Sequence, residues 1–257
     1  MPDALLQVRD LTVELRGMGA VLSAVSFDAA EGAIVGLFGE SGCGKTTLAL
    51  AILNLLPQGS YSVRGSIRLR GQELVGLRDP AMERVRGGVI SMIFQDPILA
   101  LNPVMRIRDQ VNEVVRAHDG SGDAASLLNL AGLPPSRRIL DAYPHQLSGG
   151  ERQRVLIAQA LAGRPSVVIA DEPFTALDAV RVVELALLFR ELREKTGTSF
   201  LVISHSPGVL ARIADSVLVM QAGRIVEQGP PDVLFRAPAH PYTAAVLAAA
   251  ERMAPRA

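Results

Sequence analysis

Nine consecutive residues carry the clearest chemistry in this sequence. They are Gly39, Glu40, Ser41, Gly42, Cys43, Gly44, Lys45, Thr46 and Thr47, and the first eight match the spacing G-x-x-x-x-G-K-[ST] at every fixed position. The apolar run 33–38 predicts a buried strand before them, and the pattern over 48–56 predicts a helix after them. Between a strand and a helix, glycines let backbone N–H groups surround a phosphate, because no Cβ obstructs the loop or the approaching anion at Gly42 or Gly44.

Lys45 and Thr46 sharpen this prediction. Lys45 adds a positive point charge, Thr46 offers a hydroxyl oxygen to Mg²⁺, and the start of the helix is partly positive. A glycine-rich turn that binds nothing would not call for Lys-Thr at a helix start. The sequence therefore predicts a site for the phosphates of a nucleotide. Cys43, the single cysteine, cannot form an internal disulfide and is expected to be a filler within the loop.

Two carboxylates follow another predicted strand. Val-Val-Ile-Ala over 167–170 indicates a buried strand, and Asp171, Glu172 and Pro173 end it. Open α/β sheets place ligands at the carboxyl ends of their strands. We therefore expect Asp171 to reach Mg²⁺, and Glu172 to polarise the water that attacks the γ-phosphate. An acidic pair at a turn, without chemistry, is the alternative.

Gln95 and His205 also follow predicted strands, over 89–94 and 199–204. Gln95 could be a surface residue, or its amide oxygen could hold Mg²⁺ or the attacking water. A lone histidine is more often structural than catalytic. We select His205 because it is the third polar side chain at a strand end near one phosphate site. No chemistry is assigned to the other histidines, which are His118, His145 and His240.

Leu-Ser-Gly-Gly-Glu over 147–151 predicts a second anion site. Ser148 with Glu151 three residues later is the pattern of a capping box, so a helix should begin here. Gly149 and Gly150 leave backbone N–H groups uncovered, and a helix start without side chains can bind an anion. The pattern S-x-x-E is common, and a helix cap alone is the alternative. Two such helix ends can hold one γ-phosphate between them if they come from different molecules.

Composition bounds the class of protein. A chain of 257 residues with 49% hydrophobic content and alternating strand and helix patterns can bury one α/β core with an insertion. The formal charge is zero, with 26 basic and 26 acidic residues, so no net field favours nucleic acid or an anionic membrane. No apolar run approaches the roughly 18 residues of a membrane-spanning helix, and we expect a cytoplasmic chain. Cysteine and histidine show no metal-ligand spacing.

The pattern of periodicity changes along the chain. Strand-like runs over 5–16, 21–27 and 65–71 predict a largely β N-terminal third. From Asp96 to about Gly163, helical patterns predict an inserted helical subdomain, with helices over 107–117, 124–131 and 151–162. Its entry loop, 96–103, has two prolines with apolar residues between them. Partner contact and ordinary burial are both open for these apolar residues.

Taken in order, these motifs resemble those of ATP-binding subunits of ABC transporters, over nearly the whole chain. The resemblance implies an α/β fold with a P-loop NTPase core that is RecA-like, an antiparallel β subdomain and an inserted α-helical subdomain. It divides the chain into a core over 1–95 and 164–236, a helical subdomain over 96–163, and a short C-terminal helical tail over 237–257.

The resemblance also implies roles for the residues. ATP would be bound by residues 39–47 and Gln95, and hydrolysed with the catalytic residues Glu172, His205 and Gln95. Mg²⁺ would be held by Thr46, Gln95 and Asp171. The signature residues, which act on ATP bound by an opposing subunit, would be Ser148, Gly149, Gly150 and Glu151. Asp178 would belong to the D-loop, and its position predicts the N-cap of a helix over 179–195.

Partners follow from the same resemblance. We expect a second ATPase subunit, identical or related, and two transmembrane permease subunits at the cytoplasmic face of the membrane. An extracytoplasmic solute-binding protein would act indirectly, and no nucleic acid is expected. The loop after Gln95 resembles the site that receives a coupling helix of the membrane subunit.

Other motifs indicate which subfamily of ABC transporters the chain resembles. Further motifs, including His-Pro-Tyr-Thr over 240–243, resemble importers of oligopeptides, dipeptides and nickel. Peptide members typically carry a longer C-terminal extension, often with cysteines, so nickel or a metal chelate is favoured over short peptides. The alternative is an ATPase subunit of a soluble complex such as a phosphonate-cleaving assembly. Two departures matter: Leu15 or Arg16 lies where an aromatic residue usually stacks on adenine, and Ser206 replaces an aspartate.

Overall fold

The computed structural model describes residues 4–118, 122–175 and 177–253. It contains two compact units, residues 1–82 with 201–257, and residues 83–200. The chain enters the second unit within α2 (Asp79–Val85) and returns to the first within β8 (Ser199–Ile203). The division into a core and a helical subdomain over 96–163 remains a prediction.

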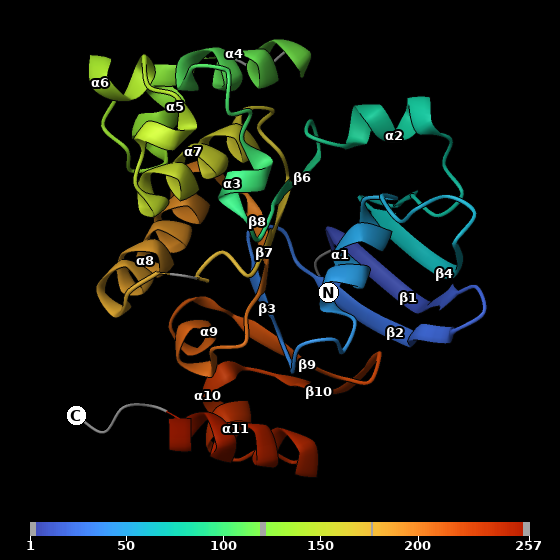
Figure 1. The fold of residues 1–257 in the computed structure, drawn as a ribbon. Coiled ribbons are helices and arrows are strands. Elements are labelled where there is room, and N and C mark those ends of the chain that lie inside the picture. The colour runs from blue at the N-terminus through green and yellow to red at the C-terminus, as the bar shows by residue number, and fades with distance from the viewer. Residues whose placement is uncertain (1–3, 119–121, 176, 254–257) are drawn as a thin grey trace. The chain divides into compact units, whose positions relative to one another are not determined.

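An antiparallel sheet forms much of the first unit (Figure 1). Its strands lie in the order β2-β1-β4-β5 and are β1 (Leu6–Leu15), β2 (Gly19–Ala29), β4 (Tyr61–Leu69) and β5 (Gln72–Glu73). In β1 the buried side chains switch from Leu6 and Val8 to Leu11 and Val13. A bulge with Asp10 at φ 48° makes this possible, because one extra residue returns the apolar side chains to the core face. The predicted β-rich N-terminal third is confirmed.

A second set of strands in this unit carries the predicted phosphate loop. The strand order is β10-β9-β3-β8, with β3 (Ile34–Phe38), β9 (Ser216–Gln221) and β10 (Arg224–Gly229). All five residues of β3 are buried, as expected for a strand covered on both faces. The helices are α1 (Lys45–Ile52), α9 (Pro207–Ile213), α10 (Pro231–Arg236) and α11 (Pro241–Met253).

The helix after the loop is shorter than predicted. α1 ends at Ile52, whereas the pattern over 48–56 indicated four more residues. Asn54 adopts φ 51°, the left-handed conformation that ends many helices, so the chain turns away there.

The second unit joins two parallel strands to a group of helices. Its elements are β6 (Ile90–Ile93), α3 (Pro97–Ala100), α4 (Ile107–Ala117), α5 (Ala124–Leu130), α6 (Arg137–Leu140), the 3₁₀ turn η1 (Pro144–Gln146), α7 (Gly149–Leu161), β7 (Val167–Asp171) and α8 (Ala179–Thr196). α4, α5 and α7 pack against one another, and α7 packs on β6 (Figure 1). The predicted helices over 107–117, 124–131 and 151–162 are confirmed within two residues. None of the described helices has the length and apolar content needed to cross a membrane.

Candidate active site

The loop between β3 and α1 leaves the start of α1 open. The N-cap residue is Gly44, whose φ of 109° lies in the left-handed region. Among the described residues no side chain caps this end, and no acidic residue lies in the first turn. The first N–H groups of a helix have no intrahelical partner and carry the positive end of its dipole. This end of α1 can therefore bind an anion.

The glycines of the loop are required for different reasons. A Cβ on Gly39 would lie 2.3 Å from the carbonyl oxygen of Met220, and a Cβ on Gly44 would lie 2.7 Å from Leu22 Cδ2. Gly42 has open space around it but adopts φ 81°, which disfavours any side chain. Gly39 and Gly44 therefore allow the loop to pack closely against the rest of its unit, and Gly42 allows the loop to turn.

Lys45 holds the loop in its present form. Its side chain is buried, and Nζ donates to the carbonyl oxygens of Gly39 and Glu40, both at 2.8 Å. Cys43 is also buried, and this burial raises the pKa of its thiol although Lys45 Nζ is close by. A buried thiol with a raised pKa is unreactive at neutral pH. The remaining residues of the motif are Glu40, Ser41 and Thr46, which are exposed, and Thr47, which is half-buried.

His205 lies at the edge of the sheet where the phosphate loop begins. The N–H of Ser204 donates to the carbonyl oxygen of Leu37 at 3.1 Å, which fixes the end of β8 beside the end of β3. His205 follows directly and is exposed. The first unit thus brings His205 to the same edge as the loop. Ser206 precedes α9 but its side chain does not cap that helix.

Gln95 and Asp171 follow neighbouring parallel strands of the second unit. Ile93 of β6 pairs with Ala170 of β7, so the two strands end at one edge. Asp171 is the last residue of β7 and is 3% exposed, whereas Gln95 is exposed two residues beyond β6. The two predicted Mg²⁺ ligands of this unit therefore lie at the same strand edge.

Glu172 has an unusual backbone conformation that the sequence did not indicate. Its φ is 48°, in the left-handed region that residues other than glycine seldom adopt. Such conformations persist only when the surrounding structure enforces them, and they cluster at functional sites. The β7 strand thus ends in a buried carboxylate followed by one held in a strained turn.

The predicted capping box at the start of α7 is confirmed. The side chain of Ser148 accepts from the N–H of Glu151 at 3.3 Å, and the carboxylate of Glu151 accepts from the N–H of Ser148 at 2.8 Å. Partial burial raises the pKa of Glu151, but hydrogen bonds from Arg138 and from Ser148 outweigh it and hold that pKa below its usual value. Neither Gly149 nor Gly150 has positive φ, and a Cβ on Gly149 would meet nothing within 4 Å. Packing against the described residues therefore does not require glycine at 149.

A cavity of about 190 Å³ lies beside the start of α7, lined in part by Ser148, Gly150 and Arg181. Gln153 also lines it. The Gln153 side chain is 4% exposed, and its Nε2 donates no hydrogen bond within the part of the chain that is described. Buried polar groups are nearly always satisfied, so this amide is a candidate to meet a ligand or a water. Sequence reasoning missed Gln153 because a glutamine on an amphipathic helix gives no signal.

Asp178 caps α8, as predicted, by accepting from the N–H of Arg181 at 3.0 Å. Its neighbour Ala176, part of the same predicted D-loop segment, lies outside the described residues.

The entry loop after Gln95 is mixed in exposure. Leu101 is buried, but Ile98 and Leu99 are 64% and 85% exposed, and Phe94 and Val104 are also exposed. Ordinary burial therefore holds for Leu101, and partner contact by the exposed residues stays a prediction. Part of the predicted loop is helical, because Asp96 caps the short helix α3 by accepting from the N–H of Ile98.

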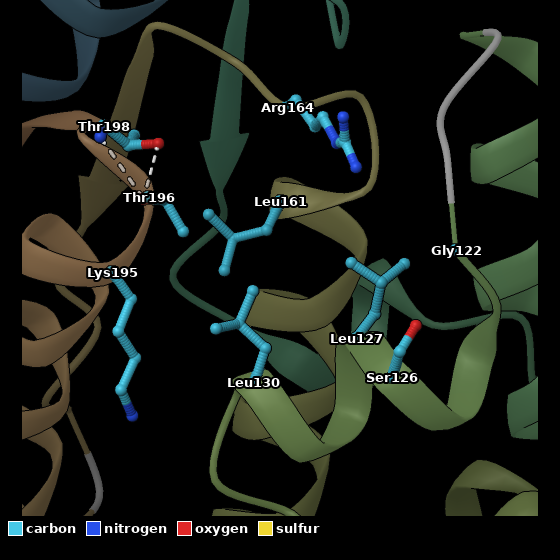
Figure 2. A pocket seen from close by; sticks show the side chains of 9 residues that line it. All are labelled: Gly122, Ser126, Leu127, Leu130, Leu161, Arg164, Lys195, Thr196 and Thr198. Atoms are coloured by element: carbon cyan, nitrogen blue, oxygen red, sulfur yellow. Dashed lines mark hydrogen bonds between the residues drawn. The ribbon is translucent and has the colours of Figure 1, made fainter.

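A separate hollow of about 620 Å³ in the second unit contains none of the predicted site residues. Figure 2 shows Leu127, Leu130 and Leu161 among the side chains that line it, together with Arg164 and Lys195. Large pockets are the default candidates for ligand sites. In this chain the candidate catalytic and phosphate-binding residues lie instead in the phosphate loop and at the strand ends.

Comparison with known proteins agrees with this geometry. The fold is that of a P-loop ATPase: the structure of MJ0796, "a Bacterial ABC Transporter Cassette" in dimeric form, matches with a TM-score of 0.75 and 26% identity, over 88% of this chain and 98% of that one. A second structure of MJ0796, "bound to ADP and Pi", matches with a TM-score of 0.75 and 25% identity over the same shares of the two chains.

Sequence relatives define the family. The family model described as "ABC transporter" matches residues 22–175. The oligopeptide transport ATP-binding protein OppD of Bacillus subtilis (strain 168) is 42% identical over 254 residues, which are 95% of this chain and 71% of OppD. OppD of Mycobacterium tuberculosis (strain ATCC 25618 / H37Rv) is 43% identical over 97% of this chain and 42% of that protein. The chain belongs to the ABC transporter family as an ATP-binding, ATP-hydrolysing subunit, which confirms the resemblance and the fold class.

Proposed function

We propose that this chain binds ATP at the open start of α1 and hydrolyses it to power the import of short peptides. The glycine N-cap at Gly44, without any capping side chain in the described residues, carries the proposal. Phosphate would replace the carbonyl oxygens of Gly39 and Glu40 as the partner of Lys45. Loop amides from Ser41 to Thr47 would donate to the phosphates.

The residues proposed to hold Mg²⁺ supply the donors that this ion prefers. Thr46 offers a hydroxyl, Gln95 an amide oxygen, and Asp171 a carboxylate, and Mg²⁺ takes oxygen ligands together with water. Asp171 fits this role because it is a buried carboxylate at the end of a parallel strand. When bound, the ion would neutralise charge on the phosphates.

Glu172 is proposed as the general base. Its carboxylate would orient a water molecule in line with the γ-phosphate and take its proton as the water oxygen bonds to the γ-phosphorus and the bond from that phosphorus to the bridging oxygen of ADP breaks. The strained backbone conformation of Glu172 supports the proposal, because such conformations cluster at functional sites. His205 and Gln95 would act as further polar partners of the phosphate and the water.

A second ATPase subunit, either another copy or a related chain, is proposed to complete the site. Ser148, Gly149, Gly150 and Glu151 would meet the γ-phosphate held by that subunit, with Asp178 at the same interface. The open space around Gly149 supports this, since no described residue lies within 4 Å of a Cβ placed there. The relatives described as dimeric cassettes agree with two subunits.

The exposed apolar residues after β6 are proposed to dock onto a permease subunit at the membrane. Ile98 and Leu99 present apolar side chains on the short helix α3, which begins at Pro97. Leu99→Asp should leave ATP hydrolysis by the isolated chain within about twofold, because surface changes away from the site are usually mild, but prevent copurification with membrane subunits in mild detergent. Normal assembly of the Leu99→Asp variant with membrane subunits would show that this segment is not part of the docking surface. The solute-binding protein would act through the permeases.

Short peptides are favoured as the solute over nickel or a metal chelate. The relatives are named for peptide or oligopeptide transport, which weighs more than the length argument for nickel. Neither of these two relatives is named for a soluble phosphonate-cleaving complex. Uptake of a labelled tripeptide and of ⁶³Ni²⁺ in cells with and without the chain tests this. We expect loss of peptide uptake alone, and loss of nickel uptake alone would reverse the assignment.

A further inference from the structure

We propose that Tyr242 is a positioning residue of the nucleotide site, through which the C-terminal helix α11 holds the phosphate loop. The N–H of Glu40 donates to the hydroxyl oxygen of Tyr242 at 3.2 Å. The two residues are 202 positions apart in the sequence and belong to the same unit. The inference rests on the proposed binding of ATP by residues 39–47.

The start of α11 is itself anchored. The carboxylate of Glu227 in β10 accepts from the N–H groups of Ala239 at 2.8 Å and of His240 at 3.1 Å. His240 Nδ1 in turn accepts from the N–H of Tyr242 at 3.2 Å. These three bonds fix the first turn of α11 to the sheet that also contains β3. Tyr242 therefore reaches the loop from a rigid support, and His240, to which no chemistry was assigned from the sequence, is part of that support.

The same sheet holds the loop elsewhere. The N–H of Gly223, in the turn between β9 and β10, donates to the carbonyl oxygen of Cys43 at 2.9 Å. Gly39 lies so close to the Met220 carbonyl that a Cβ could not fit. The β9–β10 hairpin thus fixes both ends of the turn, and Tyr242 adds a bond at Glu40 between them.

The Tyr242 bond should matter most when nucleotide is bound. In this structure Lys45 Nζ holds the carbonyl oxygens of Gly39 and Glu40. A phosphate would draw Lys45 away from them, because a charge-assisted bond is stronger than a bond to a neutral carbonyl. The hydroxyl of Tyr242 would then keep the Glu40 amide in place. Burial raises the pKa of the phenol, so it remains a neutral hydroxyl at physiological pH.

Removing this hydroxyl should weaken nucleotide binding more than turnover. For Tyr242→Phe in the full chain, loss of one hydrogen bond should raise the Kd for ATP about three- to tenfold, with kcat changed less than about twofold. Tyr61→Phe is the matched control, since it removes another half-buried tyrosine hydroxyl of the same unit. A merely structural role would lower the melting temperature without ATP and leave the Kd unchanged.

Hydrogen–deuterium exchange provides a readout that needs no activity. The Glu40 amide should exchange faster in Tyr242→Phe than in Tyr61→Phe, because its acceptor is gone. Unchanged ATP affinity together with unchanged exchange at Glu40 would overturn the inference. Lys45→Ala separates this from failure of the proposed function. If Lys45→Ala weakens ATP binding while Tyr242→Phe has no effect, only the role of Tyr242 is wrong. If Lys45→Ala binds ATP normally, the loop is not the nucleotide site.

Discussion

α1 and α7 both begin at glycines next to a predicted phosphate site, but the chain treats the two beginnings differently. At α1 the N-cap is Gly44, and no side chain of the described residues caps the helix. At α7 Ser148 and Glu151 cap each other's amides, and Glu151 adds negative charge to the first turn. A negative residue there stabilises the helix but opposes an incoming anion.

The capping at each end indicates which helix can bind a nucleotide without a partner. α1 offers uncapped amides and a buried lysine, which is a complete cradle for a polyphosphate. α7 offers Gly149 and Gly150 between two capped amides, so it is suited to add contacts to a phosphate that another site already holds. We therefore propose that α1 binds the nucleotide of its own chain and that α7 completes the nucleotide site of the opposing subunit.

The largest effect is expected from a change that leaves both helix ends intact. Glu172→Gln keeps the side-chain shape but cannot accept a proton, so kcat for ATP hydrolysis should fall about 10²–10⁴-fold. Binding should survive, because α1 and α7 are untouched. Steady-state ATPase with size-exclusion chromatography in ATP and Mg²⁺ should show a persistent loaded dimer. Hydrolysis within about threefold of the native chain would exclude Glu172 as the base.

A smaller loss of turnover is expected from filling the space at α7. Gly149→Leu adds a side chain where a Cβ meets nothing, so the chain should fold normally. It should block an approaching phosphate and lower kcat about 10²-fold, the usual result of losing oxyanion contacts. Gly229→Leu is the control, because that Cβ also meets nothing within 4 Å. Equal activity of the two variants would mean that α7 makes no phosphate contact.

Removing the α7 cap should change stability. Ser148→Ala should lower the free energy of unfolding by about 0.5–2 kcal/mol, since the N-cap bond to Glu151 is lost. In a chain of this size each kcal/mol shifts the melting temperature by about 2–4 °C. Ser41→Ala, in the loop before α1, removes no cap and should change stability by less than about 0.5 kcal/mol. Equal melting temperatures for the two variants would argue that the capping box contributes little.

The smallest effect concerns pH. Because the pKa of Glu151 is lower in the folded chain than in the unfolded one, Glu151 stabilises the fold above its unfolded pKa. That contribution is lost as the pH falls through the lower folded pKa. Thermal melts of the native chain and Glu151→Gln should therefore differ at pH 7 and converge only in acid below the folded pKa of Glu151. A difference that persists in acid would assign the effect to packing and not to charge.

Local chemistry explains how much the sequence could predict. The strand, loop and helix around Lys45 and the capping box at Ser148 depend on residues within a few positions, so both were predictable. The helix over 107–117 was predicted at both ends because its apolar face recurs regularly.

Long-range contacts explain what was missed. Tyr242 reaches Glu40 across 202 positions, and no local pattern records such a bond. The strained φ of Glu172 and the buried amide of Gln153 depend on the packed structure around them. Helix length failed at Asn54 because one residue in the left-handed conformation outweighed the helical pattern.

Equilibrium binding of ATP to single-site variants tests the contrast between α1 and α7 most directly. Isothermal titration calorimetry of the isolated chain should show Lys45→Ala weakened roughly tenfold to a hundredfold, since it loses a charge-assisted bond, and Gly149→Leu unchanged within about twofold. That result would show that ATP binds at the start of the chain's own α1, and it would agree with a role for α7 at the ATP of a partner subunit. Equal weakening in both variants, or weakening in Gly149→Leu alone, would contradict the account.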